Sequence, residues 1–254
     1  VYHTPPKKLY VKVIKDFHYL LLKFLLKTVD FLIVISEEHA NYYLNFLKKR
    51  GQIIIVPILI DNSIKNKKRI NNNSSVFKVC YAGAISKSNG VEFLIEAVKG
   101  NSKLELLIFG PSIDEYLQNL KNKYSIYKNI KFEKAKENLE TKLVLSEQDL
   151  LVIPKIKDFR ATGYIPTKLA DFLFSGTPVL ATRLGELENY IIDEYNGFLV
   201  EADNLIKLKD KILYISEKSA IDLNAIGANG IKTSKVFNYE NQVDSIFRKL
   251  TRNE

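Results

Sequence analysis

The strongest constraint on the fold is a regular alternation of short, continuously apolar segments with helical patterns over residues 77–200. Strands that alternate with helices form parallel βαβ units, and strands that are apolar at every position are covered on both faces. The sequence therefore predicts an α/β fold whose main domain, residues 76–225, is a Rossmann-like, doubly wound parallel sheet. The expected strands are 77–83, 104–110, 129–134, 149–154, 177–182 and 197–200. The expected helices are 91–99, 113–126, 137–146, 166–175 and about 187–193.

Residues 1–62 predict a smaller α/β unit. The segments DFLIVIS (30–36) and QIIIVPILI (52–60) are typical of buried strands. Ser36 is expected to cap a helix between them that ends at Gly51. A strand, a helix and a strand are too few to enclose a hydrophobic core. We therefore expect an incomplete N-terminal domain, the remnant of a second Rossmann-like domain.

Composition suggests two further boundaries. Residues 63–75 are rich in Asn, Lys and Ser and predict a linker. Residues 226–254 predict C-terminal helices, which we expect to pack back on the N-terminal part. The chain starts at Val1 and contains no methionine, which favours a processed chain or a fragment.

The charge balance indicates anionic partners. Lys and Arg number 38 against 29 Asp and Glu, a net charge of +9, which favours nucleic acids, acidic lipids or phosphorylated ligands. The basic residues are scattered and form no recognised nucleic-acid motif, so nucleic acid is not an expected partner. The single cysteine, Cys80, lies in an apolar run, which predicts a buried core position and a reducing, cytoplasmic setting.

Residues 9–29 carry a basic, amphipathic helical pattern. Lys23, Lys27 and Asp30 interrupt the longest apolar stretch, so no segment reaches the roughly 18–20 residues that a membrane span needs. Two interpretations stay open: a helix packed on a sheet, or a helix that also touches an anionic membrane surface.

Two loops at the carboxyl ends of the predicted strands have features of ligand sites, since open parallel sheets bind ligands there. In YAGAISKSNG (81–90), Gly83 and Ala84 permit close backbone approach, a helix begins after Gly90, and Lys87 adds charge. In the loop 109–114, Gly110 ends a strand. The first loop is equally consistent with a tight structural turn, and for the second the structural interpretation is favoured.

The segment IPTKLADFLFSGTPVLAT (165–182) is more specific. Pro166 suits the first turn of a helix, but Lys168 in that turn opposes the helix dipole unless an anion lies nearby. Asp171 lies three residues on and therefore shares a face with Lys168. The pair could hold a phosphate and the sugar hydroxyls of one ligand, or it could be a surface ion pair.

The same segment resembles the FPSKLYEYLASGKPVIAT pattern of the glycosyltransferase family 4 group, retaining enzymes of GT-B fold. VCYAGAISKSNGVEFLIEAV (79–98) is similar to the first strand, loop and helix of that family's C-terminal domain. GELENYIIDEYNGFLVEADN (185–204) is similar to the stretch after the acidic motif, and TVDFLIVISEEHANYYL (28–44) to the end of the N-terminal domain. The resemblance covers nearly the whole chain.

The resemblance implies a nucleotide-sugar donor bound by the C-terminal domain and an acceptor bound by the N-terminal domain. Transfer is expected to proceed with retention and without a metal or other cofactor. Asp171 matches the second acid of the family's E-x7-E motif, which contacts the ribose, and Lys168 matches the lysine of the P-S-K-L pattern. The base is expected near the backbone of residues 134–137.

Three departures from the family pattern concern the donor site. Gly163 stands where the first acid of the motif is expected, and Ala84 and Asn89 stand where two diphosphate-binding cations are expected. Lys87, Lys168 and Arg160 are the candidates to replace those cations. Glu186, in a loop at the same edge, and its neighbour Glu188 could touch the sugar or simply begin a solvated helix.

The sequence therefore predicts a glycosyltransferase that moves a sugar from a nucleotide-sugar to a glycan or lipid-linked acceptor. The alternative is a non-catalytic nucleotide-sugar-binding module or subunit that needs another chain for activity. No catalytic residue is assigned, and His3, His18 and His39 all lie in the N-terminal part. The predicted donor-binding residues are Gly83, Ala84, Lys87, Gly110, Arg160, Thr167, Lys168, Asp171 and Glu186.

Overall fold

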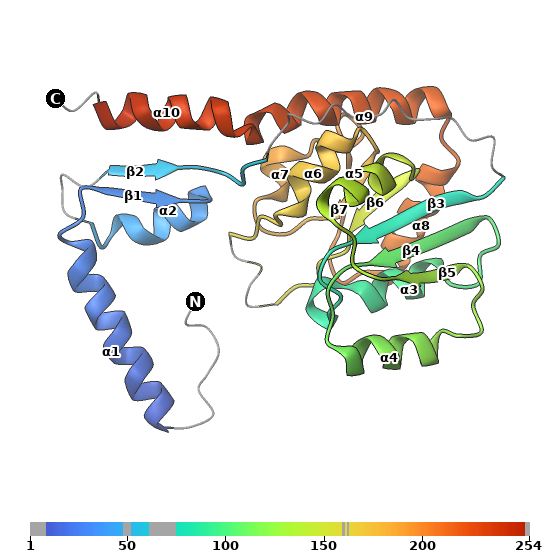
Figure 1. Ribbon diagram of the computed structural model, residues 1–254, viewed down its shortest axis with the longest axis horizontal. Coiled ribbons are helices and arrows are strands. Elements are labelled where there is room, and N and C mark those ends of the chain that lie inside the picture. Colours follow the sequence, from blue (N-terminus) through green and yellow to red (C-terminus); the bar gives the residue numbers. More distant parts are fainter. Residues whose placement is uncertain (1–8, 48–51, 61–74, 159–160, 162, 252–254) are drawn as a thin grey trace.

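A computed structural model describes residues 9–47, 52–60, 75–158, 161 and 163–251 (Figure 1). His3 and Arg160 lie outside the described residues. Of the predicted linker, residues 63–75, only Ser75 is described. The strands are β1 (Phe31–Val34), β2 (Gln52–Ile55), β3 (Phe77–Ala82), β4 (Leu104–Phe109), β5 (Ile130–Glu133), β6 (Leu150–Ile153), β7 (Val179–Thr182) and β8 (Phe198–Val200). The helices are α1 (Leu9–Leu26), α2 (Glu37–Leu44), α3 (Val91–Val98), α4 (Asp114–Lys123), α5 (Asn138–Ser146), α6 (Lys168–Ser175), α7 (Leu187–Tyr190), α8 (Leu205–Ser216), α9 (Ala220–Ser234) and α10 (Tyr239–Thr251), with short 3-10 turns η1 (Lys87–Asn89) and η2 (Lys235–Phe237).

The main sheet has the predicted doubly wound form. Its six strands are all parallel and lie in the order β5-β4-β3-β6-β7-β8. The strand order reverses between β3 and β6, so loops from both halves of the sheet meet at this switch point. The prediction of an α/β fold with a parallel sheet flanked by helices is confirmed.

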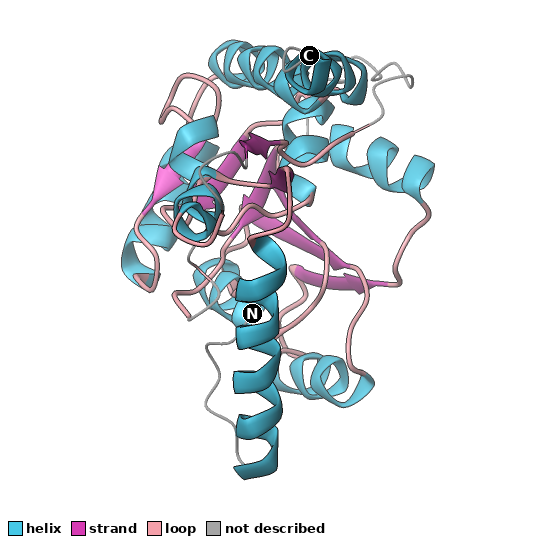
Figure 2. Ribbon diagram, turned by 90° about the vertical axis from the view of Figure 1, so that its left-hand side faces the viewer, coloured by secondary structure: helices cyan, strands magenta, loops and turns pink. Residues whose placement is uncertain are grey.

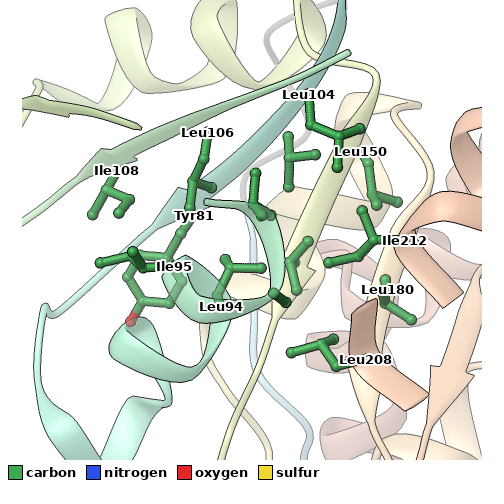
Figure 3. Close-up of a cluster of buried hydrophobic side chains, with 14 of the residues drawn as sticks. Tyr81, Leu94, Ile95, Leu104, Leu106, Ile108, Leu150, Leu180, Leu208 and Ile212 are labelled. Atoms are coloured by element: carbon green, nitrogen blue, oxygen red, sulfur yellow. The ribbon is translucent and has the colours of Figure 1, made fainter. Parts of the chain in front are cut away.

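Alternate residues of the central strands enter two separate cores, which explains why these segments are apolar throughout. Tyr81 and Val79 of β3 face a cluster formed with α3 and α8 (Figure 3). Cys80 of the same strand faces the second cluster, formed with α6 and α7, and is fully buried as predicted. Burial of both faces removes most of the strand surface from water, which stabilises the sheet.

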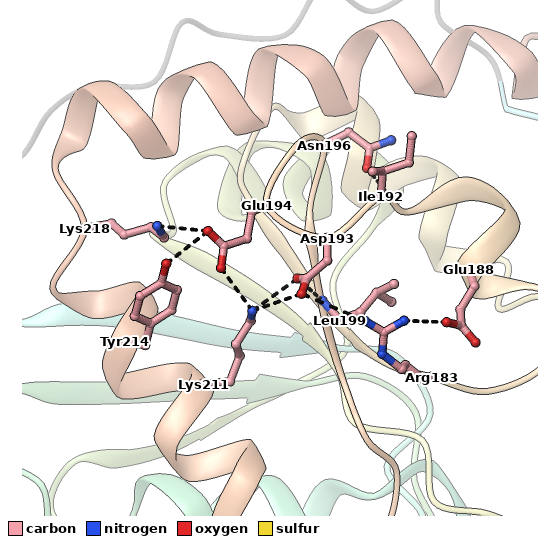
Figure 4. A network of polar contacts seen from close by, with 10 residues as sticks. All are labelled: Arg183, Glu188, Ile192, Asp193, Glu194, Asn196, Leu199, Lys211, Tyr214 and Lys218. Carbon is pink, nitrogen blue, oxygen red and sulfur yellow. Dashed lines mark hydrogen bonds and ion pairs between the residues drawn. The ribbon is translucent and has the colours of Figure 1, made fainter.

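Side-chain pairs attach the edge strand β8 to α8. Asp193, in the turn before β8, accepts a hydrogen bond from the backbone N–H of Leu199 at 2.9 Å and pairs with Lys211 at 3.2 Å. Glu194 pairs with Lys211 at 3.4 Å and accepts from the Tyr214 hydroxyl at 3.0 Å (Figure 4). Glu194 has a φ of 63°, a left-handed conformation that costs free energy for a residue with a side chain. The turn before β8 thus joins that strand to α8.

The N-terminal unit is a two-stranded parallel sheet of β1 and β2 with α2 beside it. Ser36 caps α2 as predicted, since its Oγ accepts from the His39 N–H at 3.1 Å. The predicted end of this helix at Gly51 is wrong, because α2 ends at Leu44 and a turn follows in which Phe46 packs on Tyr42. The predicted strand 52–60 stops at Ile55, two residues before a proline that has no N–H to donate.

The C-terminal helices connect both sheets. The expected boundary at residue 225 falls inside α9, which packs on α6. Beyond α9, the Ile60 N–H donates to the Phe237 carbonyl at 2.9 Å, and the Tyr239 N–H donates to the Ile60 carbonyl at 3.4 Å. Figure 1 shows α10 lying along the β1–β2 sheet. The tail therefore returns to the N-terminal unit.

Helix α1 projects from the N-terminal unit (Figures 1 and 2) and carries an unusual surface. Leu9, Leu20 and Phe24 are 79%, 68% and 66% exposed. Lys23 faces the protein instead, with its ammonium 5.0 Å from the centre of the Phe46 ring, in the turn after α2. Within the described residues, no helix combines the length and the apolarity that crossing a membrane requires.

Candidate functional site

A cavity of about 180 Å³ opens beyond the carboxyl ends of β3, β4 and β5, beside the first turn of α6. Parallel sheets bind ligands at this edge because several loops and helix N-termini converge there. The lining residues are Ala82, Gly83, Phe109, Gly110, Pro111, Ala135, Lys136, Thr141, Leu145, Lys168, Asp171 and Phe172. Four of the predicted residues, Gly83, Gly110, Lys168 and Asp171, therefore come together at one site.

The floor of this cavity is backbone. Gly110 has a φ of 142°, and a Cβ built on it would lie 2.1 Å from the Gly83 carbonyl oxygen, so only glycine fits. The Gly83 N–H donates to the Phe109 carbonyl at 3.0 Å. At Gly83, with a φ of 137°, a Cβ would make only ordinary contact with Lys168, 3.4 Å from its Nζ. Gly110 is therefore the glycine that lets the loop after β4 approach the backbone at the end of β3.

Lys168 is a cation enclosed by aromatic rings. Its Nζ lies 3.8 Å from the centre of the Tyr81 ring and 5.8 Å from that of Phe172. Among the described residues, this ammonium has no hydrogen bond and no ion pair. Burial lowers the pKa of Lys168 to about 7, against a small opposing effect of Cys80. An unpaired ammonium of this kind gains stability when an anion enters the cavity.

Asp171 stands one helical turn away from Lys168. Burial raises the pKa of its carboxyl, while Lys142 acts in the opposite direction. The predicted alternative, a Lys168–Asp171 surface ion pair, is not found, and within the described residues no hydrogen bond donor satisfies the Asp171 carboxylate. Both groups are therefore open to a ligand that carries negative charge at one end and hydroxyls at the other.

Helix α6 begins later than predicted. Its first residue is Lys168, and Thr167 is the N-cap but makes no side-chain capping bond. The Pro166 carbonyl accepts a hydrogen bond from the Leu169 N–H at 2.9 Å. The chain therefore forms a turn at Pro166, before the helix begins. Thr167 precedes Lys168 in the sequence, but its side chain is exposed and does not line the cavity.

Ala84 and Lys87 lie outside this cavity. Both line a neighbouring, mainly apolar hollow of about 460 Å³ together with Ser86 and Ser112. The Asn89 side chain donates to the Ala84 carbonyl at 2.8 Å, and the Tyr81 hydroxyl donates to the same oxygen at 2.6 Å. These bonds curl the β3–α3 loop and leave Lys87 exposed to solvent.

Glu186 is placed against the N-terminal unit. Only 6% of it is exposed, and its carboxylate accepts from the Glu38 N–H at 2.9 Å and from the Asn189 amide at 2.6 Å. Glu188 pairs with Arg183 at the surface. Neither carboxylate lines the cavity that contains Lys168.

One buried cation at this edge was not anticipated. Lys155 follows β6 and is only 3% exposed; its Nζ donates to the Ser88 carbonyl at 2.8 Å and pairs with Asp158 at 2.9 Å. It therefore links the loop after β6 to the loop after β3. Its place directly after the apolar segment LLVIP was the available signal in the sequence.

Comparison with known proteins identifies the family. Residues 62–233, which include all of the six-stranded sheet, match the glycosyl transferases group 1. The chain belongs to this family. The predicted membership of a glycosyltransferase group is thus confirmed at this level, and the cavity lies within the matched residues.

This group 1 glycosyl transferase is similar to curated glycosyltransferases in sequence and to solved structures in fold. The chain is 30% identical over 213 residues to the uncharacterized glycosyltransferase MJ1178 of Methanocaldococcus jannaschii, a match that covers 83% of the chain and 56% of that protein. Sucrose-phosphate synthase from Thermosynechococcus elongatus has a similar structure, with a TM-score of 0.76, 21% identity, and 94% of this chain and 63% of the other covered. Anabaena HepE, solved in complex with UDP and glucose, gives a TM-score of 0.72 at 15% identity, over 88% and 63% of the two chains.

The group 1 glycosyl transferase chain spans about half the length of the curated relatives it matches. Within its described residues, no three His, Cys, Asp or Glu side chains lie together as a metal site would require. Transfer without a metal stays a prediction.

Proposed function

We propose that this chain binds the donor in a glycosyltransferase that moves a sugar from a nucleotide-sugar to a glycan or lipid-linked acceptor, with retention of configuration as in family 4. The observation that carries the proposal is that Lys168 and Asp171, an ammonium and a carboxylate without a hydrogen bond or ion pair among the described residues, line one cavity. Their chemistry matches the two ends of a nucleoside diphosphate. The diphosphate is negative, and the ribose offers two vicinal hydroxyls to a carboxylate.

Each part of the ligand has a counterpart in the cavity. Lys168 and the first turn of α6 hold the diphosphate. Asp171 accepts from the ribose hydroxyls, and the base lies against the backbone at Ala135 and Lys136, where the cavity is bounded by the segment after β5. The second cation of the cavity, Lys136, is already paired with Glu133 and Glu140 at 2.9 and 2.7 Å. Lys168 is therefore the principal anion-binding group.

The same arrangement assists transfer. The bond between the sugar C1 and the terminal phosphate oxygen breaks with its electron pair going to that oxygen. The acceptor oxygen bonds to C1, and its proton passes to the departing phosphate. Negative charge grows on the departing nucleotide, and a positioned ammonium with helix N–H groups stabilises that charge in the transition state.

The test is calorimetric titration of the chain with UDP, GDP, ADP and their common sugar conjugates, beside an Asp171→Ala variant. Uridine nucleotides come first because HepE was solved with UDP and glucose. Micromolar binding of one nucleotide, lost in the variant, supports the donor site. Failure of every nucleotide to bind the native chain refutes it.

A non-catalytic binding module is the second candidate. Gly163, at the position of the first motif acid, cannot supply a carboxylate, which favours binding without turnover. An assay of the protein with donor and acceptor extracts separates the two candidates. Released nucleotide together with transferred sugar supports the enzyme, and binding alone supports the module.

The exposed face of α1 motivates a membrane contact in a cytoplasmic setting. An anionic bilayer would cover Leu9, Leu20 and Phe24 while Lys12 reaches the headgroups. Co-sedimentation with vesicles containing phosphatidylglycerol, but not with phosphatidylcholine vesicles, is the expected result. Equal failure with both kinds of vesicle contradicts this contact.

A further inference from the structure

Two hydrogen bonds join the N-terminal unit to the loops beside the cavity. The Glu38 carboxylate, on the first turn of α2, accepts from the backbone N–H of Gly163, in the segment between β6 and α6. The backbone N–H of the same Glu38 donates to the Glu186 carboxylate at 2.9 Å, in the segment after β7. We call this pair of bonds the α2 clamp.

The surfaces that the clamp joins are tightly fitted. Gly163 has a φ of 62°, and a Cβ built there would lie 2.9 Å from His39 Cε1 and 3.2 Å from Ser36 Oγ. Ser36 is buried and also bonds the His39 ring at 2.7 Å. The N-terminus of α2 therefore lies directly on the backbone of the loop, with no space for a side chain between them.

At the other end of the α2 clamp, the Glu186 carboxylate has hydrogen-bond partners for both of its oxygens. Glu186 is buried, and its second oxygen is satisfied by Asn189. The Glu186 N–H donates to the Tyr164 carbonyl at 3.1 Å, so the two loops that the clamp reaches are also bonded to each other. A buried carboxylate with all its partners in place is a rigid anchor, whereas removal of a partner is costly.

The clamped loop is the one that leads into the anion site. Gly163 and Tyr164 precede Pro166, where the chain turns, and Lys168, where α6 begins. We propose that Glu38 is a positioning residue: through the α2 clamp it holds the 163–167 segment, and with it the first turn of α6 and Lys168, in the geometry that binds a diphosphate. The consequence for diphosphate binding rests on the proposed function; the mechanical role does not.

The test compares three variants in the first turn of α2. Glu38→Ala removes the acceptor for the Gly163 N–H, and Glu38→Gln keeps an acceptor oxygen at the same reach. Glu37→Ala is the matched control, because Glu37 is an exposed neighbour with the same charge. Hydrogen exchange is followed at the Gly163 and Tyr164 amides and at those of Lys168 to Ala170, in the full chain without ligand.

Glu38→Ala should speed exchange at both sets of amides by about tenfold, as loss of a bond to a charged group implies. Glu38→Gln and Glu37→Ala should exchange like the native chain. Unchanged exchange at Gly163 in Glu38→Ala overturns the clamp. Faster exchange at Gly163 with unchanged exchange at Lys168 to Ala170 overturns the role in positioning α6.

UDP affinity gives the second readout. Glu38→Ala should weaken it by at least about threefold, Glu38→Gln much less, and Glu37→Ala not at all. If the native chain binds no nucleotide, the proposed function fails, while the exchange data still decide the clamp. If Glu38→Ala binds UDP like the native chain, the positioning role fails although the donor site stands.

Discussion

The ammonium of Lys168 on α6 lies 3.8 Å from the centre of the Tyr81 ring on β3, with no carboxylate paired to it among the described residues. Cation–π contact offsets part of the cost of burying an ammonium, but it does not neutralise the charge. The site thus contains a cation whose best partner is an added anion. The first three predictions depend on this relationship.

Replacement of Lys168 by methionine should weaken nucleoside diphosphate binding by roughly 10- to 100-fold, the effect expected for one charge-assisted hydrogen bond. Methionine retains an apolar stem against Tyr81, so the cavity wall is kept. Calorimetric titration with the preferred nucleotide measures the change. Lys87→Met, at an exposed lysine outside the cavity, should remain within about twofold of the native chain. Equal losses in both variants would mean that general positive charge, and not the Lys168 site, governs affinity.

Binding should depend on pH through Lys168. Its pKa is lowered to about 7 by burial in the free protein, and a bound diphosphate favours the charged form and raises that pKa. Affinity should be fully present below pH 7 and fall as pH rises through the interval between the free and bound pKa values, by up to about tenfold per pH unit. Titrations in buffers of different ionisation enthalpy should show proton uptake on binding at pH 7.5. Absence of uptake, or uptake that persists in Lys168→Met, contradicts this assignment.

Lys168→Met should also stabilise the free protein. The pKa of Lys168 is lower in the folded than in the unfolded protein, so the unfolded chain binds more protons at neutral pH. The resulting loss of folding free energy is largest below pH 7. It disappears as the pH rises toward the ordinary lysine pKa. At pH 6.5 the variant should melt at least about 2 °C higher than the native chain. The gain should be smaller at pH 9. A lower melting temperature at both pH values would show that the ammonium is stabilising where it stands.

Asp171→Ala should remove discrimination between ribose and deoxyribose. In the native chain the carboxylate accepts from both ribose hydroxyls, so UDP should bind at least about fivefold more tightly than 2′-deoxy-UDP. The variant should bind both weakly and equally. Asp171→Asn, which keeps one acceptor oxygen, should lie between them. If discrimination survives in Asp171→Ala, another group contacts the ribose.

Gly110→Ala should destabilise the fold by about 2 kcal/mol or more, because the added Cβ would lie 2.1 Å from the Gly83 carbonyl oxygen. Gly100→Ala is the matched control: that glycine also has a positive φ, of 72°, but an added Cβ there meets only the Tyr127 ring at 3.6 Å. It should cost about 1 kcal/mol. Urea unfolding monitored by circular dichroism measures both. Equal costs would mean that backbone strain outweighs the steric contact.

The sequence by itself determined the six parallel strands and most of their helices. Residues such as Val79, Cys80 and Tyr81 are apolar in succession because both faces of β3 are covered, and this pattern is local. Glycine after the strand, and Pro-Thr before the helix with Lys as its first residue, likewise marked the edge where the cavity lies. These signals depend on neighbours within a few residues, so they can be recognised in the chain before it folds.

Only the tertiary structure decided which of the marked residues share a site. Lys87 and Lys168 are both candidate cations in the sequence, yet the first is exposed and lies outside the cavity, whereas the second lines it against the Tyr81 ring. Glu186 seemed a partner for the sugar, but it receives the Glu38 N–H from a segment far away in the chain. Burial, desolvation and long-range hydrogen bonds arise when distant segments meet, and these determine the charge state and accessibility of a side chain.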